Sequence, residues 1–200
     1  MRIGWILGWA APEAWFAPIA RVALPQAEHV FIPAVPQALN QLEQAGAFDW
    51  TVGYSLGSLL LLGQAARFSG RRVALLAPIF AFSSEESLGG KVSRTKVRHL
   101  ARWLKHEPLA ALADFYERAV LHVPPGLHAG APEMLLWGLE RLEKDRIEPP
   151  LPPGWRAWCG AEDALLDARR LQALDAAVGI VPDGTHHPRH LVEALAKAIA

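Results

Sequence analysis

The sequence is poor in cysteine and methionine, and it has no excess of either charge. Its one cysteine, Cys159, excludes an intramolecular disulfide framework and is compatible with a reducing cytoplasm. Lys and Arg together number 20, as do Asp and Glu, so the composition favours neither nucleic acid nor a membrane surface as a partner. No apolar run is long enough to span a bilayer. Pro12 and Glu13 interrupt the first run, which we expect to be a core strand and not a signal peptide.

Apolar side chains are abundant, at 52% of the 200 residues, which is enough for the core of one domain. Short segments that are apolar throughout alternate with longer segments of helical periodicity. Such strands are typical of a parallel sheet whose two faces are covered by helices, so we predict an α/β fold. The expected strands are residues 3–7, 29–33, 50–54, 72–77, 156–159 and 179–181. The expected helices between them are residues 13–23, 37–44, 55–68, 166–176 and 188–199.

This alternation is interrupted in the middle of the chain. Between Phe80 and Pro153 the pattern predicts no strand and instead three helices, at residues 94–105, 108–121 and 132–144. An all-helical segment between two sheet-forming parts is typical of a lid over an α/β sheet. We therefore expect one domain over residues 1–200, with a helical lid at 79–153 inserted between core segments 1–78 and 154–200.

The most informative stretch is Gly53-Tyr54-Ser55-Leu56-Gly57, which ends an expected strand and opens a helix. A G-x-S-x-G sequence in this setting is typical of a nucleophile elbow, a sharp turn that exposes a serine hydroxyl. Strand and helix nearly touch there, so the positions two before and two after the serine must lack side chains, as Gly53 and Gly57 do. The alternative is an ordinary glycine-flanked turn, and residues later in the chain decide between the two.

Acyl transfer by a serine needs a base that takes the hydroxyl proton and an acid that orients the base. In this arrangement the acid follows the serine along the chain and the histidine comes last. Asp163, just after the expected strand at 156–159, is our candidate acid. Glu162 and Asp167 are alternatives, although Asp167 better suits the solvated first turn of a helix.

Three histidines occur around the junction of the last expected strand and the last expected helix. His186 is our candidate base, because from this loop it can reach the strand ends near Ser55. His187 is the alternative, but it directly precedes a proline and is conformationally restricted. A metal site of His186, His187 and His190 would lack an obvious further carboxylate or cysteine at ligand spacing. We therefore expect neither a metal nor a cofactor.

Two backbone amides are expected to bind the negative oxygen of a reaction intermediate. One is the N–H of Leu56, directly after the serine, at the positive end of the helix dipole. The other is the N–H of Trp9, in the loop Leu7-Gly8-Trp9-Ala10 that follows the first strand.

Together these motifs resemble those of a known superfamily, the α/β-hydrolases. The motifs that carry the resemblance are Gly8-Trp9, Gly53-Tyr54-Ser55-Leu56-Gly57, Gly160-Ala161-Glu162-Asp163 and Gly184-Thr185-His186-His187-Pro188. Within the superfamily they are most similar to the small pimeloyl-acyl-carrier-protein methyl ester esterases of biotin synthesis, over nearly the whole chain. The chain departs from many relatives in lacking their early strands and in having Leu7 where they have histidine.

The resemblance implies an α/β-hydrolase fold with a reduced, mostly parallel sheet and a triad of Ser55, Asp163 and His186. It also implies hydrolysis of a methyl ester on a carrier-bound acyl chain, so our interpretation is a serine carboxylic-ester hydrolase. One alternative is a general small-ester carboxylesterase without a carrier-protein partner. Another, from a different class, is a non-catalytic acyl-binding protein. We expect a cytoplasmic monomer that binds neither nucleic acid nor membranes.

The expected lid carries a basic stripe. Its five residues are spaced 3, 4, 4 and 3 apart, which would place them on one face of a helix: Lys91, Arg94, Arg98, Arg102 and Lys105. No acidic residue occurs between positions 87 and 106, so the sequence predicts positive charge without local neutralisation. Charge runs of this kind are usually a solvated helix face. Our hypothesis is that the stripe binds an acidic carrier protein and its phosphate-bearing arm, although a free anionic substrate would suit the spacing equally.

Overall fold

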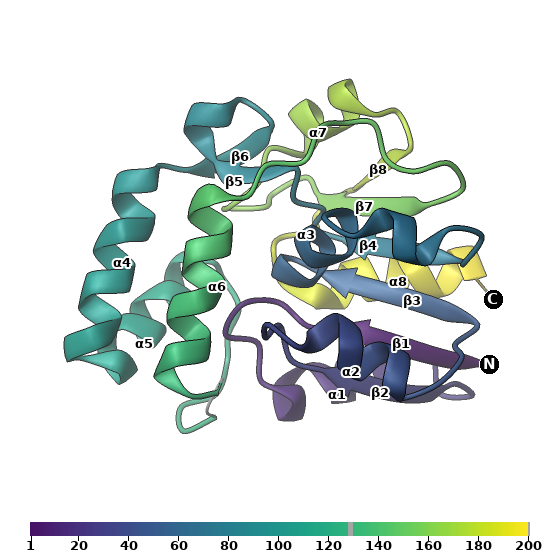
Figure 1. Ribbon diagram of the computed structural model, residues 1–200, viewed down its shortest axis with the longest axis horizontal. Helices are drawn as coiled ribbons and strands as arrows, with labels where there is room; N and C mark the ends of the chain where they lie inside the picture. Colours follow the sequence, from purple (N-terminus) through teal and green to yellow (C-terminus); the bar gives the residue numbers. More distant parts are fainter. Residues whose placement is uncertain (128–129, 200) are drawn as a thin grey trace.

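One sheet of parallel strands organises the computed structural model, which describes residues 1–127 and 130–199 (Figure 1). Its six strands lie in the order β2-β1-β3-β4-β7-β8, and every neighbouring pair is parallel, as predicted. Their bounds are β1 Arg2–Ile6, β2 Glu28–Ile32, β3 Trp50–Tyr54, β4 Val73–Leu76, β7 Arg156–Gly160 and β8 Val178–Val181.

The middle of the sheet is buried on both sides. Every residue of β3 and of β4 is buried, and so are the residues of β1 from Ile3 to Ile6. Continuous burial explains why these segments are apolar throughout and do not alternate with polar residues. Because all six strands run in the same direction, their carboxyl ends meet at one edge, where the loops after β1, β3, β7 and β8 lie close together.

Helices cover both faces of the sheet. On one face α1 (Glu13–Ala23) packs against α8 (Pro188–Ile199); on the other lie α2 (Ala38–Gln44) and α3 (Leu56–Leu62) (Figure 1). α7 (Ala168–Leu174) contacts β7 and β8. The helix expected at 55–68 is divided: α3 ends at Leu62 before the C-cap Gly63, and a 3₁₀ turn, η1, spans Ala65–Phe68. No helix among the described residues has the length and apolar character needed to cross a membrane.

The insert lies beyond the carboxyl ends of the strands (Figure 1). It contains the three predicted helices, α4 (Arg94–His106), α5 (Pro108–Arg118) and α6 (Pro132–Lys144), and α4 packs against the other two. Local sequence explains where they begin. The Ser93 side chain accepts a hydrogen bond from the Lys96 amide at the start of α4, and Pro108 and Pro132 occupy the first positions of α5 and α6.

The expectation of an all-helical insert is wrong at its beginning. β5 (Ala81–Ser83) and β6 (Gly89–Val92) form a two-stranded parallel sheet, with a 3₁₀ turn, η2 (Ser84–Glu86), between them. The strands are only three and four residues long, and β6 begins with two glycines, which strands usually avoid. Gly90 is nevertheless suited to its place, because a Cβ there would collide with the Phe82 carbonyl. A requirement for close backbone approach does not appear as hydrophobic periodicity.

Candidate active site

Ser55 lies at the sharp turn between β3 and α3. Its backbone angles are φ 52° and ψ −116°, a conformation that a residue with a side chain rarely adopts. The Ser55 amide donates to the Leu76 carbonyl over 2.9 Å, and the Ser58 hydroxyl donates to the Ser55 carbonyl over 2.6 Å. These bonds hold the strained turn from both sides, and the serine is 7% exposed.

The two glycines of the elbow are required by close approach. A Cβ at Gly53 would lie 2.7 Å from the Gly57 carbonyl oxygen, and one at Gly57 would collide with the carbonyl of Ile6. Helix α3 therefore starts in contact with both β3 and β1. This contact places the helix N-terminus directly behind Ser55.

His186 reaches the serine from the loop between β8 and α8. Its Nε2 lies 3.0 Å from the Ser55 Oγ, and its Nδ1 lies 2.8 Å from Oδ2 of Asp163. Its side chain is 2% exposed, so water does not compete for either ring nitrogen. The loop before His186 packs closely against the end of β7, where the loop that carries Asp163 begins. A Cβ at Gly160 would collide with the Gly184 carbonyl.

Asp163 lies just after β7 and is buried. Its Oδ1 accepts hydrogen bonds from the amides of Leu165 (2.8 Å) and Leu166 (3.0 Å), which leaves Oδ2 for the histidine. A carboxylate that only accepts hydrogen bonds favours the histidine tautomer with its proton on Nδ1, so Nε2 is free to accept the serine proton. The three side chains thus form one directed chain of hydrogen bonds. Nearby Cys159 is fully buried, and burial followed by the charge of Asp163 raises the pKa of its thiol.

The alternative residues lie elsewhere. Glu162 is exposed, and Asp167 caps α7 by accepting a hydrogen bond of 3.0 Å from the Arg170 amide. His187 faces away from Ser55 and packs edge-on against Trp15, with 5.3 Å between the ring centroids. Within residues 1–127 and 130–199, no group of three or more His, Cys, Asp or Glu side chains is arranged to hold a metal ion.

His187 lines a surface depression of about 460 Å³ together with His122, His190 and Arg189. Burial lowers the pKa of His187 to about 4, and the neighbouring charges of Arg189, His122 and His190 act in the same direction. The ring is therefore neutral at pH 7. Among the described residues it is His186, and not His187, that forms a hydrogen bond with Ser55.

The two expected amide donors are both available. In the described part of the chain, neither the N–H of Trp9 nor that of Leu56 has a hydrogen-bond partner. Trp9 follows β1 and Leu56 opens α3, two elements that meet at Gly57. Unpartnered amides near a serine can bind a developing oxyanion.

The insert packs directly on the loop that carries Trp9. The Trp9 indole N–H donates to the Leu135 carbonyl of α6 over 2.8 Å, and its ring lies edge-on to Phe115, 4.6 Å away between centroids. The Tyr116 hydroxyl donates to the Ala10 carbonyl over 2.7 Å. A Cβ at Gly138 of α6 would lie 2.5 Å from the Trp9 ring. No short-range pattern could have predicted these contacts, because they join residues more than a hundred positions apart.

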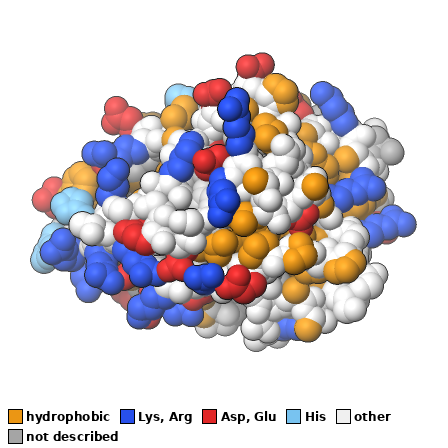
Figure 2. Space-filling model, turned by 90° about the horizontal axis from the view of Figure 1, so that it is seen from above, with side chains coloured by type: hydrophobic (Ala, Val, Ile, Leu, Met, Phe, Trp, Pro, Cys, Tyr) orange, Lys and Arg blue, Asp and Glu red, His pale blue; other side chains and the backbone are white. Residues whose placement is uncertain are grey.

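The basic stripe does not form the single unneutralised face that its spacing predicts. Lys91 lies on β6 and not on α4. Arg94 pairs with Glu86, and Arg98 Nε lies 2.6 Å from a carboxylate oxygen of Glu143. These acidic partners belong to η2 and α6. They therefore lie outside residues 87–106, the segment in which the sequence shows no acidic residue. Figure 2 shows acidic side chains interspersed among the basic ones at the insert end of the molecule.

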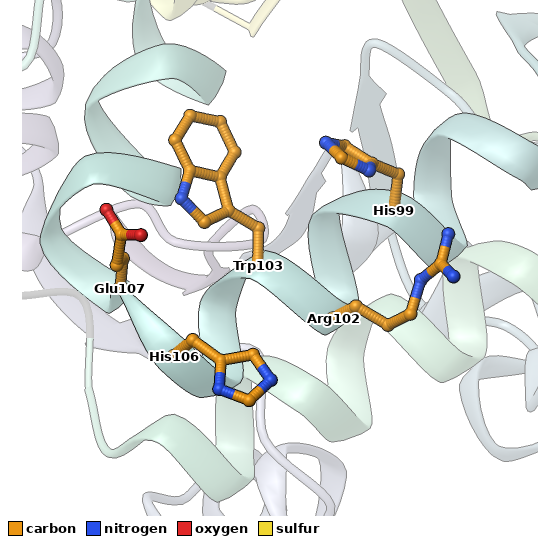
Figure 3. Close-up of a pocket in the computed structure, with 5 residues that line it drawn as sticks. All are labelled: His99, Arg102, Trp103, His106 and Glu107. Carbon is orange, nitrogen blue, oxygen red and sulfur yellow. The ribbon is translucent and has the colours of Figure 1, made fainter.

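Of the four stripe residues on α4, Arg102 and Lys105 are exposed and have no ion pair among the described residues. Both belong to the last turns of α4. Arg102 also lines an open depression of about 590 Å³ with His99, Trp103, His106 and Glu107 (Figure 3). This depression contains no residue of the candidate triad.

A cavity of about 530 Å³, lined by both apolar and charged side chains, lies between the three insert helices and the loop that carries Asp163. Its apolar lining includes Phe82, Leu100, Trp103, Phe115, Leu139 and Leu165. Lys96 and Arg102 also line the cavity, whereas Arg118 pairs there with Asp114 over 2.7 Å. Phe115, which lines this cavity, also contacts the Trp9 ring, so the cavity lies next to the loop that carries Trp9.

Comparison with known proteins supports the fold assignment. No protein-family model matches the sequence, and no curated protein sequence matches it. Among solved structures, a thermophilic esterase from Thermogutta terrifontis is 17% identical, with a TM-score of 0.68 over 100% of this chain and 88% of the esterase. An enol-lactonase from Burkholderia xenovorans LB400 is 17% identical, with a TM-score of 0.69 over 99% of this chain and 89% of the lactonase.

A third similar structure is a bottromycin epimerase, which is 15% identical, with a TM-score of 0.66 over 100% of this chain and 90% of the epimerase. Since the similar structures include an epimerase as well as an esterase and a lactonase, the likeness establishes architecture and leaves the reaction to be argued from the site. On strand order, helix placement and these similarities, the chain has the α/β-hydrolase fold.

Proposed function

We propose that the protein is a serine ester hydrolase that works through an acyl-enzyme. The observation that carries the proposal is the hydrogen-bonded chain from Ser55 Oγ to His186 (3.0 Å) and from His186 to Asp163 (2.8 Å), all buried at one sheet edge. The two unpartnered amides beside the serine complete the requirements for acyl transfer.

The chemistry follows from these positions. Ser55 Oγ attacks the ester carbonyl carbon while His186 Nε2 takes the hydroxyl proton, and Asp163 stabilises the imidazolium that forms. The negative oxygen of the tetrahedral intermediate accepts hydrogen bonds from the N–H groups of Trp9 and Leu56. Collapse of the intermediate breaks the bond to the alkoxy oxygen, which takes the proton from His186 and leaves as the alcohol. Water then repeats the sequence on the acyl-enzyme and releases the carboxylic acid and Ser55.

The test combines covalent labelling with turnover. A fluorophosphonate probe should label the wild-type protein, which should also hydrolyse p-nitrophenyl acetate, and Ser55→Ala should abolish both. Ser69→Ala, at an exposed serine outside the site, is the matched control and should behave as wild type. Folded wild-type protein that is not labelled would support the non-catalytic acyl-binding alternative. Labelling without turnover of any ester would contradict ester hydrolysis.

We further propose that the substrate is a methyl ester on an acyl chain carried by an acidic carrier protein, with pimeloyl as the acyl group. The motif resemblance motivates this choice of substrate. The apolar part of the cavity, which includes Phe115, suits a linear acyl chain, and exposed Arg102 and Lys105 suit an anionic partner. Arg94 and Arg98 contribute less to such binding, because acidic neighbours already neutralise them.

Two measurements test the substrate. The value of kcat/KM for the methyl ester of the pimeloyl carrier protein should exceed that for a free short-chain methyl ester. The gene should also restore growth to a strain unable to demethylate that carrier ester, and the Ser55→Ala variant should not. Equal kcat/KM values without rescue would favour the small-ester carboxylesterase.

A further inference from the structure

The first part of the insert is joined to the loop that carries Asp163. The Lys91 amide of β6 donates to the Leu165 carbonyl over 2.9 Å, and the Asp167 amide donates to the Gly89 carbonyl over 2.7 Å. Gly90 and Leu166 form an antiparallel bridge between these two bonds. The acid loop is therefore held along its length by a strand that does not belong to the central sheet.

The Lys91 side chain makes a third bond to the same loop. Its Nζ donates to the backbone carbonyl of Asp163 over 2.6 Å. A hydrogen bond from an ammonium group is shorter and stronger than one between neutral groups. Lys91 thus holds the loop at two points, with its amide at Leu165 and its ammonium at Asp163.

The segment that Lys91 and β6 hold also orients the Asp163 carboxylate. Oδ1 of Asp163 is oriented by the amides of Leu165 and Leu166, which are residues of the held segment. Any displacement of this segment moves the Oδ1 donors and the Asp163 backbone together. Oδ2 would then move relative to His186 Nδ1, which it meets at 2.8 Å. A continuous series of contacts therefore links the insert to the Asp163 loop, the Asp163 carboxylate, His186 and Ser55.

We propose that Lys91 is a positioning residue that fixes Asp163 against His186 and so makes the triad depend on the insert. The proposal rests on the proposed function, because its kinetic consequence is a consequence for ester hydrolysis. Lys91 itself is exposed, and its strand, β6, belongs to the two-stranded sheet of the insert and not to the central sheet. An exposed lysine has many conformations in water, so its bond to the Asp163 carbonyl is a specific arrangement.

The test is a double-mutant cycle on p-nitrophenyl acetate. The acetyl group is too short to fill the insert cavity that Lys91 also lines, so binding in that cavity does not enter the result. Lys91→Met should lower kcat on the order of tenfold with little change in KM, because small misplacements of catalytic groups are costly. Lys91→Arg should restore part of the loss. Lys197→Met, at an exposed lysine of α8, is the matched control.

The cycle is closed with Asp163→Asn. If Lys91 acts through Asp163, then Lys91→Met in the Asp163→Asn background should change the residual kcat by less than about twofold. If Lys91→Met lowered kcat by the same factor in both backgrounds, or lowered it in neither, the proposal would be overturned. Either result would leave the proposed function intact, because that rests on wild-type turnover and its dependence on Ser55.

A spectroscopic measurement covers the case in which the wild-type protein does not hydrolyse esters. The proton on His186 Nδ1, hydrogen-bonded to Asp163, should give a far-downfield proton resonance. In Lys91→Met this resonance should shift or broaden, while it stays unchanged in Lys197→Met at equal melting temperature. An unchanged resonance in folded Lys91→Met would contradict the positioning role whatever the activity. If the methionine variant does not fold, Lys91→Gln serves in its place.

Discussion

The Tyr54 hydroxyl donates a hydrogen bond of 2.8 Å to the backbone carbonyl of His186. Tyr54, the residue before Ser55, therefore holds the loop that carries His186, across 132 positions of the chain. Tyr54 is fully buried, and burial, followed by the charge of Asp163, raises its pKa well above the ordinary value. The hydroxyl therefore keeps its proton at neutral pH and remains a donor.

Tyr54→Phe should lower both stability and turnover. The substitution leaves the buried His186 carbonyl without this donor, which should cost about 1–2 kcal/mol in the free energy of unfolding. A looser His186 loop should also reduce kcat severalfold while KM changes little. Urea unfolding and p-nitrophenyl acetate kinetics measure the two effects. Unchanged values of both would show that the hydrogen bond does not position the base.

Asp163→Asn should distinguish the three candidate acids. Because an amide cannot stabilise the imidazolium and can favour the wrong tautomer, kcat should fall on the order of 10²–10⁴-fold with little change in KM. Glu162→Gln should keep kcat within about twofold of wild type, since Glu162 is exposed. Asp167→Asn should keep the α7 cap and also leave kcat nearly unchanged. A large loss of kcat in either control variant would contradict the assignment of the acid.

Gly57→Ala should destabilise the whole domain. The new methyl group would collide with the carbonyl of Ile6 in the central sheet, and backbone atoms cannot move aside as a side chain can. We expect a loss of about 3 kcal/mol or more in the free energy of unfolding. Gly63→Ala, at the other end of α3, is the comparison, because its φ is −63° and the nearest atom lies 3.3 Å away. Similar unfolding midpoints for the two variants would contradict the predicted collision.

His187 should make stability depend on pH. Its pKa is about 4 in the folded protein and about 6.5 when unfolded, so between these values the unfolded state binds more protons. Stability from this group is therefore present above pH 6.5 and is lost as the pH falls towards 4. After discounting for partial solvent exposure, the effect should be on the order of 1 kcal/mol.

The measurement compares urea unfolding of wild type and His187→Gln at pH 7 and pH 4.5. Wild type should lose more free energy of unfolding across this interval than the variant, whose residue 187 cannot titrate. Equal losses in the two proteins would show that His187 is not held neutral by its surroundings.

Reversing the charges of Arg102 and Lys105, the stripe residues of α4 without an ion pair among the described residues, should separate partner binding from chemistry. Arg102→Glu with Lys105→Glu should lower kcat/KM for a carrier-bound ester by about tenfold or more, because an acidic partner would then meet like charge. Turnover of p-nitrophenyl acetate should stay nearly unchanged. Arg98→Glu alone should have a smaller effect on the carrier ester, since Arg98 is already paired with Glu143. Equal losses on both substrates would contradict docking at this helix.

The sequence predicts the positions of the triad residues because of a topological rule. Gly160 and Val181 end adjacent parallel strands, so the loops that follow them, with Asp163 and His186, open at the same sheet edge as Ser55. Parallel strands place their carboxyl ends together whatever their order in the chain. Knowing which segments are strands was therefore enough to expect the three side chains near one another.

The insert was predicted less well, for two physical reasons. β5 and β6 are stabilised by close backbone approach at Gly90 and by contact with the acid loop, neither of which leaves a periodic apolar pattern. The charge of the stripe was overestimated because Glu86 and Glu143 neutralise Arg94 and Arg98 from other elements. Neighbours along a helix can be read from spacing, but ion pairs between elements depend on how those elements pack.

The sequence by itself determined the parallel sheet, the elbow at Ser55 and the order of acid and base, since these depend on local backbone preference and on burial along single segments. Only the tertiary structure decided which histidine nitrogen meets which oxygen, which cations stay unpaired, and that Lys91 of the insert holds the Asp163 loop. Such contacts join residues distant in the chain, and their distances are fixed by the packing of whole elements. The elbow could therefore be predicted from the pentapeptide together with the acid and histidine that follow it in the chain, whereas the link between the insert and the Asp163 loop could not.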